Sequence, residues 1–258
     1  MDLSYKEQHE KLSIRVRAHK EFANLDIADW MESFLADQGL NAPKILDLGC
    51  GNGNHVGLYL KFAGSEGEVH GLDRESSLVE SAKEKYRDAD NLFLAVRSMD
   101  DPLPFEDGTF DLCFSNFAIY NATVPRNTLL EVKRVMKSGA KFVMIGPTAK
   151  NAKEIYEFNE RLTGTPIDEV TLIRTDRLRQ EILPIANEIF GSSEQKLINS
   201  YLTFPSKEEF VKYYTATMLY EEDAEKKGVS LEAMYEACLS DENIILSKEM
   251  LAVVVTKA

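Results

Sequence analysis

The residues best suited to do chemistry lie in one glycine-rich segment, Ile45-Leu46-Asp47-Leu48-Gly49-Cys50-Gly51-Asn52-Gly53. Alternating glycines let a backbone turn sharply and approach a ligand closely. The spacing departs from the G-x-G-x-x-G of nicotinamide-binding folds, because Asn54 stands at the last glycine position, and no Gly-Lys-Ser/Thr follows to make a P-loop. In the pattern D-x-G-x-G-x-G, the carboxylate of Asp47 can orient the loop or meet the charged amino-acid end of a ligand.

A second acidic residue follows the turn at a sequence spacing that is typical of nucleoside-binding folds. Asp73 ends the apolar segment Val69-His70-Gly71-Leu72-Asp73. It lies about twenty residues after the glycines, the spacing at which a strand-end carboxylate takes both ribose hydroxyls. A lone acid at a strand end is often only a helix cap. Its combination with the glycine turn predicts a ribose contact for Asp73.

The elements that must position these residues alternate along the chain. Short apolar segments bounded by Gly, Pro or Asp predict strands, and segments with helical spacing of apolar residues predict helices. Such alternation favours a parallel sheet with helices on both faces and a ligand site beyond the carboxyl ends of the strands. The expected strands are 44–48, 68–72, 92–96, 110–115 and 141–145, and the expected helices are 25–40, 56–62, 77–85 and 128–136.

The alternation of strand and helix patterns ends after Gly146. Residues 150–195 have helical patterns, and we expect a strand at 197–204, a helix at 207–219 and a closing strand at 250–256. The predicted fold class is α/β, a Rossmann-like, mostly parallel sheet of seven strands. We divide the chain into an N-terminal helical segment over the cleft (1–40), a ligand-binding core (41–149), a helical cap insertion (150–195) and a return to the core sheet (196–258). The insertion could close over a ligand or only add packing.

Four motifs in order resemble those of the class I S-adenosylmethionine-dependent methyltransferases, particularly the group with small-molecule acceptors. The glycine segment looks like their first motif and the Asp73 strand like their second. The segment Leu103-Pro104-Phe105-Glu106-Asp107-Gly108-Thr109-Phe110-Asp111 resembles the signature before their fourth strand, and Glu131-Val132-Lys133-Arg134-Val135-Met136-Lys137-Ser138-Gly139-Ala140 the helix and turn before their fifth. The resemblance spans residues 44–146.

The resemblance implies a set of contacts to S-adenosylmethionine, whose product is S-adenosylhomocysteine. Residues of the glycine turn would lie against the methionine portion, Asp73 would bind ribose, and Asn116 would lie beneath the sulfonium. Arg74 would flank the adenine, and a loop would surround its ring. This chain has Arg97-Ser98-Met99 where many relatives have Gly-Asp-Ala, so the adenine contacts are less defined than the ribose contact. The implied cofactor-binding residues are Asp47, Gly49, Cys50, Gly51, Gly53, Asp73, Arg74, Ser98, Met99, Asp100 and Asn116.

A sulfonium methyl group is already electrophilic, so the enzyme mainly aligns the acceptor and excludes water. A hydroxyl or protonated amine acceptor would also use a general base, for which Tyr120 and His19 are the main candidates and Tyr5 and Arg15 weaker ones. Ser115-Asn116-Phe117-Ala118 lacks the Asn/Asp-Pro-Pro-Tyr/Phe motif of enzymes that methylate adenine or glutamine nitrogens. No His/Asp/Glu cluster has metal-ligand spacing, so no metal is predicted.

Composition and net charge limit the classes of binding partner and the cellular location that we expect. The 258 residues carry a formal net charge of −13, which disfavours a nucleic-acid substrate. Two basic groups, one around Arg15 and His19 and one at Arg174, Arg177 and Arg179, are either solvated helix faces or contacts to an anionic substrate. No apolar run is long enough to span a membrane and the N-terminus lacks a signal-peptide core, so we expect a cytoplasmic protein. Three widely spaced cysteines predict reduced thiols.

Methyl transfer to a small molecule is therefore the leading hypothesis, with the acceptor atom and oligomeric state open. The alternatives are a tRNA or protein methyltransferase and a non-catalytic scaffold that binds the cofactor.

Overall fold

The computed structural model of the chain describes residues 9–167 and 169–258. Its centre is a seven-stranded sheet in the order β3-β2-β1-β4-β5-β7-β6. Strands β1 to β5 run parallel, and β7 pairs antiparallel with both β5 and β6. This confirms the predicted Rossmann-like fold class. The strands are β1 Lys44–Leu48, β2 Glu68–Asp73, β3 Leu92–Val96, β4 Phe110–Asn116, β5 Met136–Pro147, β6 Ser193–Phe204 and β7 Ile244–Thr256.

Helices cover both faces of the sheet because its central strands are apolar on both sides. On one face, α2 (Ile27–Ala36) and α3 (Val56–Ala63) pack through Met31 and Tyr59. On the other, α5 (Pro125–Val135) and α8 (Leu183–Phe190) pack through residues such as Leu129 and Ala186. Helix α4 (Ser76–Lys85) lies beside β2 and β3. The carboxyl ends of β1, β2 and β4 therefore meet at one edge, between these layers.

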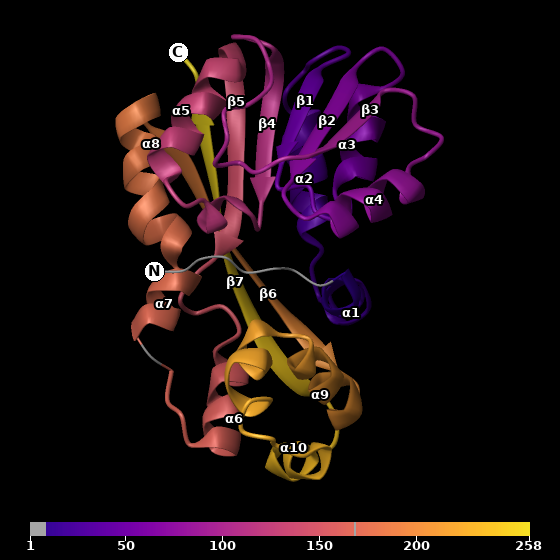
Figure 1. Cartoon of the computed structure of the whole chain (residues 1–258), viewed down its shortest axis with the longest axis vertical. Coiled ribbons are helices and arrows are strands. Elements are labelled where there is room, and N and C mark those ends of the chain that lie inside the picture. Colours follow the sequence, from indigo (N-terminus) through magenta and orange to yellow (C-terminus); the bar gives the residue numbers. More distant parts are fainter. Residues whose placement is uncertain (1–8, 168) are drawn as a thin grey trace.

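Strands β6 and β7 extend well past the rest of the sheet, as Figure 1 shows. Their antiparallel ladder continues without interruption from the Ser193–Val255 pair to the Phe204–Ile244 pair. Around its far end lie α6 (Lys153–Thr163), α9 (Lys207–Thr215) and α10 (Leu231–Ala237), which share a separate apolar core with α1 (His9–Phe22). The long hairpin thus connects the sheet to a second, helical cluster.

The predicted strands 197–204 and 250–256 are shorter than those observed. The extra residues include polar ones such as Glu194 and Lys248, which weaken the apolar strand pattern, but pairing along the whole hairpin satisfies their backbone groups. The helix expected at 25–40 is longer than the one observed. Helix α2 begins after Asp26, whose side chain accepts a hydrogen bond from the Ala28 N–H at 2.9 Å, and it ends at Ala36.

Residues 150–195 contribute to two places in the molecule. Helix α6 packs in the helical cluster, whereas the π-helical turn Leu178–Ile182 and α8 join the core beside α5. Helix α7 (Glu169–Thr175) lies between them along the chain. That this segment acts as one cap, with the boundaries given above, stays a prediction. Within the described ranges, no helix is long and apolar enough to cross a membrane.

Candidate cofactor and acceptor site

The glycine turn after β1 is built from left-handed backbone. Gly49, Gly51 and Gly53 have φ values of +85°, +53° and +76°, a region that favours glycine. The N–H of Gly49 donates to the Leu72 carbonyl at 2.7 Å, which fixes the turn to the end of β2. A Cβ atom added at Gly49 would lie 2.2 Å from the Cβ of Ala118. The turn therefore lies directly against the segment that follows β4, as a close approach to a shared ligand requires.

Asp73 ends β2 and connects the turn to the start of α4. Its Oδ2 accepts a hydrogen bond from the Gly51 N–H at 2.8 Å, and its Oδ1 accepts one from the Glu75 N–H at 2.9 Å. Each carboxylate oxygen keeps a further acceptor position. The predicted ribose contact is therefore compatible with these bonds. The helix-cap alternative that the sequence left open is not what the structure has, because Glu75 is the N-cap residue of α4.

Asp47 lies beneath the turn and is 2% exposed. Burial, and secondarily the charge of Asp73, raise the pKa of Asp47 to about 7. A buried carboxyl of this kind is stabilised in its charged form by an adjacent cation, so Asp47 suits the amino group that the sequence assigned to it. Cys50 is also buried, and burial raises the pKa of its thiol well above the usual range. This thiol is an unreactive part of the turn.

Asn116 ends β4 at the floor of the site. Its Nδ2 donates to the Tyr59 hydroxyl at 2.6 Å, whereas its buried Oδ1 has no hydrogen-bond donor in the described part of the chain. The next residue, Phe117, has a left-handed φ of +55° and is 36% exposed. A bulky residue in this conformation is strained, and the N–H of Phe117 is held by the Ile145 carbonyl at 2.7 Å. The chain therefore turns abruptly where β4 and β5 reach the site.

The loop after β3 carries the residues expected around adenine. Met99 is the nearest of them to the turn, because its Cε would lie 3.4 Å from a Cβ at Gly49. Asp100 is bound within the protein, since its two carboxylate oxygens accept from the backbone N–H and the hydroxyl of Thr123 at 2.7 and 2.8 Å. Ser98 accepts from the Asp100 N–H, and Arg74 lies 3.5 Å from Glu75. Adenine contacts by these four residues stay predictions.

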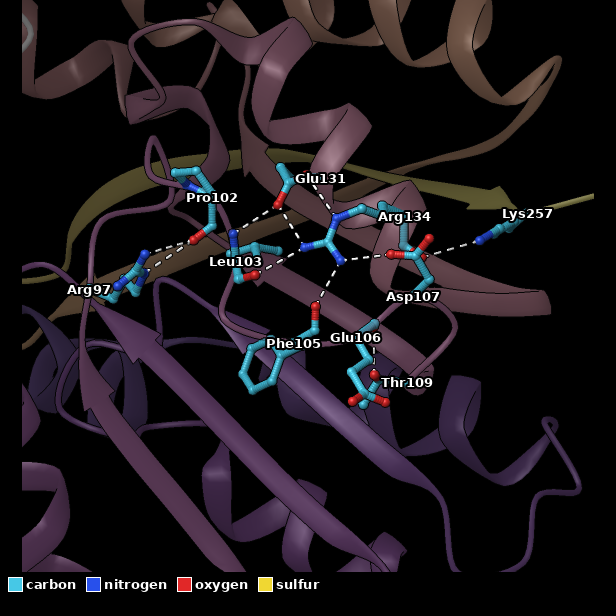
Figure 2. Close-up of polar contacts among 10 residues, drawn as sticks. All are labelled: Arg97, Pro102, Leu103, Phe105, Glu106, Asp107, Thr109, Glu131, Arg134 and Lys257. Atoms are coloured by element: carbon cyan, nitrogen blue, oxygen red, sulfur yellow. Dashed lines mark hydrogen bonds and ion pairs between the residues drawn. The ribbon is translucent and has the colours of Figure 1, made fainter.

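Figure 2 shows how the same loop is fixed to α5. The Arg134 guanidinium donates to the carbonyls of Leu103 and Phe105 and to the carboxylates of Glu131 and Asp107, at 2.7 to 2.9 Å. Glu131 in turn accepts from the Leu103 N–H at 2.8 Å. Hydrogen bonding to Arg134 lowers the pKa of Glu131. The segments 103–111 and 131–140, which the resemblance identified as motifs, thus hold the loop beside the cofactor turn.

The two proposed general bases lie in different places. Tyr120 belongs to the 3-10 turn Ile119–Asn121 after β4, and its Cδ1 would lie 3.1 Å from a Cβ at Gly146 on β5. His19 lies on α1 beside Tyr213, with ring centroids 6.1 Å apart. Burial, then the charges of Lys248 and Arg15, lower the pKa of His19 to about 3. His19 is therefore a weak base near neutral pH, whereas Tyr120 adjoins the strand ends. Tyr5 falls outside the described residues.

Sequence reasoning missed three neighbours of the site. Leu12 of α1 would lie 4.0 Å from a Cβ at Gly51, so α1 reaches the turn. Tyr59 supports Asn116 from α3. Asn52, inside the turn, has a buried Oδ1 that accepts no hydrogen bond from residues 9–167 or 169–258. Only Asn52 had a signal in the sequence, its place between two glycines, because the other two approach through tertiary packing.

These features fit a nucleoside with an amino-acid end. The glycine turn has the left-handed backbone of a close approach, and the Asp73 carboxylate keeps acceptor positions for hydroxyls. Two buried amide oxygens, on Asn52 and Asn116, have no hydrogen-bond donor among the described residues, although such groups require one. No group of three or more His, Cys, Asp or Glu side chains in the described ranges could hold a metal ion. Fold and site together define a class I S-adenosylmethionine-dependent methyltransferase.

Comparison with known proteins agrees with this class. A family model described as a methyltransferase domain matches residues 41–193, and the chain belongs to this family. The demethylmenaquinone methyltransferase of Staphylococcus aureus is 29% identical over 192 residues, which cover 72% of this chain and 71% of that protein. A solved structure from Bacillus halodurans shares the fold, with a TM-score of 0.59 and 15% identity over 88% of this chain and 98% of its own. One from Galdieria sulphuraria, titled a sarcosine dimethylglycine methyltransferase, has a TM-score of 0.54 and 16% identity over 90% of this chain and 85% of its own.

Proposed function

We propose that this enzyme transfers the methyl group of S-adenosylmethionine to a small organic acceptor bound beside the carboxyl ends of β4 and β5. The observation that carries the proposal is the contact between the cofactor turn and the end of β4, where Gly49 adjoins Ala118 two residues after Asn116. The contact supports a binding mode in which the reacting end of the cofactor would lie next to Phe117 and Tyr120. The proposal includes the cytoplasmic location expected from the sequence.

The chain's own residues have separate tasks in this proposal. S-adenosylmethionine supplies an electrophilic methyl group when bound. Asp47 and the glycine turn hold the amino-acid end, and Asp73 holds the ribose. Asn116 limits movement below the sulfonium, since its amide is anchored to Tyr59. Helix α1, which reaches Gly51 through Leu12, excludes water from above the turn.

The relatives support a small acceptor. The matched proteins from Staphylococcus aureus and Galdieria sulphuraria are named for the methylation of demethylmenaquinone and of sarcosine or dimethylglycine. These acceptors differ in chemistry. The relatives therefore support a small acceptor for this enzyme, but the identity of the acceptor depends on the residues of its own site. The net charge of −13 also disfavours a nucleic-acid acceptor.

The first experiment is calorimetric titration with S-adenosylmethionine and S-adenosylhomocysteine, with a nicotinamide dinucleotide as the negative control. We expect binding of the first two only. A library of small metabolites is then incubated with the enzyme and S-adenosylmethionine and analysed by mass spectrometry for the addition of about 14 Da, one CH₂.

Each outcome decides between the hypotheses. A methylated small molecule together with S-adenosylhomocysteine supports the proposal. Cofactor binding with methylation only of added tRNA or protein would replace it by one of those activities. Binding with no turnover on any of the three substrate classes would favour the scaffold role, and absence of binding would refute the cofactor assignment for the isolated chain.

A further inference from the structure

Arg177 is a buried cation at the start of the π-helical turn Leu178–Ile182. The sequence left it either on a solvated helix face or in contact with an anionic substrate, but a residue that is 6% exposed is not on a solvated face. Its Nε and Nη2 donate to the carboxylate of Glu181 at 2.6 and 3.2 Å. Its Nη1 donates to the carbonyls of Tyr120 and Ala122 at 2.6 and 2.7 Å. Arg177 thus joins the segment after β5 to the segment after β4.

The two carbonyl bonds fix the backbone around the 3-10 turn Ile119–Asn121. A charged guanidinium donates stronger hydrogen bonds than a neutral group, and its planar shape holds two acceptors in a set geometry. Glu181 balances the charge, which would otherwise make the burial of Arg177 costly. The place of this turn therefore depends on a side chain from a distant part of the sequence.

The same segment is held from the cofactor side by the loop after β3. Asp100, one of the residues expected around adenine, accepts hydrogen bonds from the N–H and the hydroxyl of Thr123 at 2.7 and 2.8 Å. Thr123 follows Ala122 directly, so the bonds of Asp100 and Arg177 end on adjacent residues. Residues 119–123 therefore connect the loop beside the cofactor turn to the π-helical turn.

The ring of Tyr120 lies against the end of β5, beside the residue that follows Arg177. A Cβ atom added at Gly146 would lie 3.1 Å from Cδ1 of Tyr120 and 3.1 Å from Cδ2 of Leu178. The two side chains thus share the space over Gly146. Arg177 holds the backbone of Tyr120 while its neighbour Leu178 packs beside the Tyr120 ring.

We propose that Arg177 is a positioning residue for methyl transfer, which sets the Tyr120 side chain beside the acceptor by holding the carbonyls of Tyr120 and Ala122. The proposal rests on the methyltransferase function proposed above, with the acceptor beside the ends of β4 and β5. In this role Arg177 contacts neither substrate and acts through Tyr120. Since the acceptor must lie in line with the methyl group, a small displacement of the residues around it slows the reaction strongly.

The test follows the Tyr120 ring directly. The full chain is labelled with fluorotyrosine, saturated with S-adenosylhomocysteine and observed by fluorine NMR, with the Tyr120 signal assigned by a Tyr120→Phe variant. We expect Arg177→Met to shift the Tyr120 signal, because the turn loses both carbonyl bonds. Arg177→Lys, whose single ammonium lacks the planar fork, should give a smaller shift. Gly146→Ala, which crowds the ring from β5, should also move this signal.

Two control variants separate the carbonyl bonds from the ion pairs around them. Glu181→Gln removes the charge of the partner but leaves the carbonyl bonds, and Arg174→Met removes the pair with Glu222 on the preceding helix. Both should leave the Tyr120 signal in place. Arg177→Met should change S-adenosylhomocysteine affinity by less than about threefold, because the four bonds of Arg177 do not end on the glycine turn.

Kinetics with an acceptor found by the mass-spectrometric screen extends the test to the reaction. Arg177→Met should lower kcat by about tenfold or more while the KM for S-adenosylmethionine stays within about twofold. Arg177→Lys should recover part of the lost kcat. A role confined to general stability would change neither parameter in a folded variant.

Several results would overturn the proposal. They are an unchanged Tyr120 signal in Arg177→Met, an equal shift in Arg174→Met, and a parent kcat despite a displaced ring. If Arg177→Met does not fold, an unchanged signal in Arg177→Lys has the same meaning. Failure of the parent chain to bind S-adenosylhomocysteine, measured first, would instead count against the methyltransferase function.

Discussion

Asp73 is the residue on which cofactor binding should depend most. We expect Asp73→Ala to weaken S-adenosylmethionine binding more than tenfold, equivalent to about 1.4 kcal/mol or more, because charge-assisted hydrogen bonds to ribose are lost. Calorimetry measures the effect, with Asp90→Ala as the control, since Asp90 is an exposed acid beyond α4. Unchanged affinity in a folded Asp73→Ala protein would show that Asp73 serves only the Gly51 and Glu75 amides.

Asp47 should make stability depend on pH in the opposite sense to an ordinary ion-paired acid. The pKa of Asp47 is raised from 3.8 to about 7 in the fold, so between these values the folded chain holds a proton that the unfolded chain has released. The contribution of Asp47 to stability therefore falls as pH rises from about 4 to about 7 and is constant outside this window.

The matching variant is Asp47→Asn. Without cofactor, we expect it to be more stable than the parent at pH 8, by about 1–4 kcal/mol, and nearly equal below pH 4, because the amide carries no buried charge. Denaturant unfolding across this pH range gives the difference. Stability curves that stay parallel from pH 4 to 8 would contradict the raised pKa.

At the scale of elements, α5 should hold the loop between β3 and β4 mainly through Arg134. Replacing Arg134 with Met removes its bonds to Leu103, Phe105 and Asp107. We expect a loss of about 1–3 kcal/mol in unfolding free energy, because carbonyls and carboxylates lose their donor, and weaker cofactor binding as the loop shifts.

Arg126→Met on the same helix is the matched control. Arg126 pairs with Glu188 at an exposed position, at 3.0 Å through Nη1, and such pairs contribute little. Denaturant unfolding should show almost no change in unfolding free energy for this variant. If both arginine variants lose the same stability, the bonds in Figure 2 have no special part in fixing the loop.

At the scale of the whole molecule, α1 connects the cofactor turn to the helical cluster at the end of the hairpin. Its Leu12 adjoins Gly51, and the link that follows α1 reaches β6, where the Asn24 N–H donates to the Tyr201 carbonyl at 3.1 Å. A ligand held at the turn should therefore stabilise α1.

Hydrogen exchange followed by mass spectrometry measures this. Saturation with S-adenosylhomocysteine should slow amide exchange in residues 9–22 by about threefold or more, while α10, at the far side of the helical cluster, is unchanged. Equal protection of both helices would indicate a general tightening of the fold. No protection of α1 would show that it does not cover the bound cofactor.

The sequence by itself determined the sheet, the cofactor turn and the class of enzyme. These depend on local rules: left-handed turns favour glycine, buried parallel strands are short and apolar, and an acid at the end of β2 follows the turn at a set spacing. Strand β1, which is buried from Ile45 to Leu48, has the predicted bounds for this reason, and the exposed edge strand β3 also has the predicted bounds because its five residues are all apolar.

Tertiary structure alone decided how the remaining residues are used. The length of β6 and β7 depends on their pairing with each other, and the two destinations of residues 150–195 depend on which apolar faces fit together. The hydrogen bond from the Ser200 hydroxyl to the Asn24 side chain joins residues 176 positions apart. Such contacts follow from packing between distant segments, which no local pattern of residues encodes.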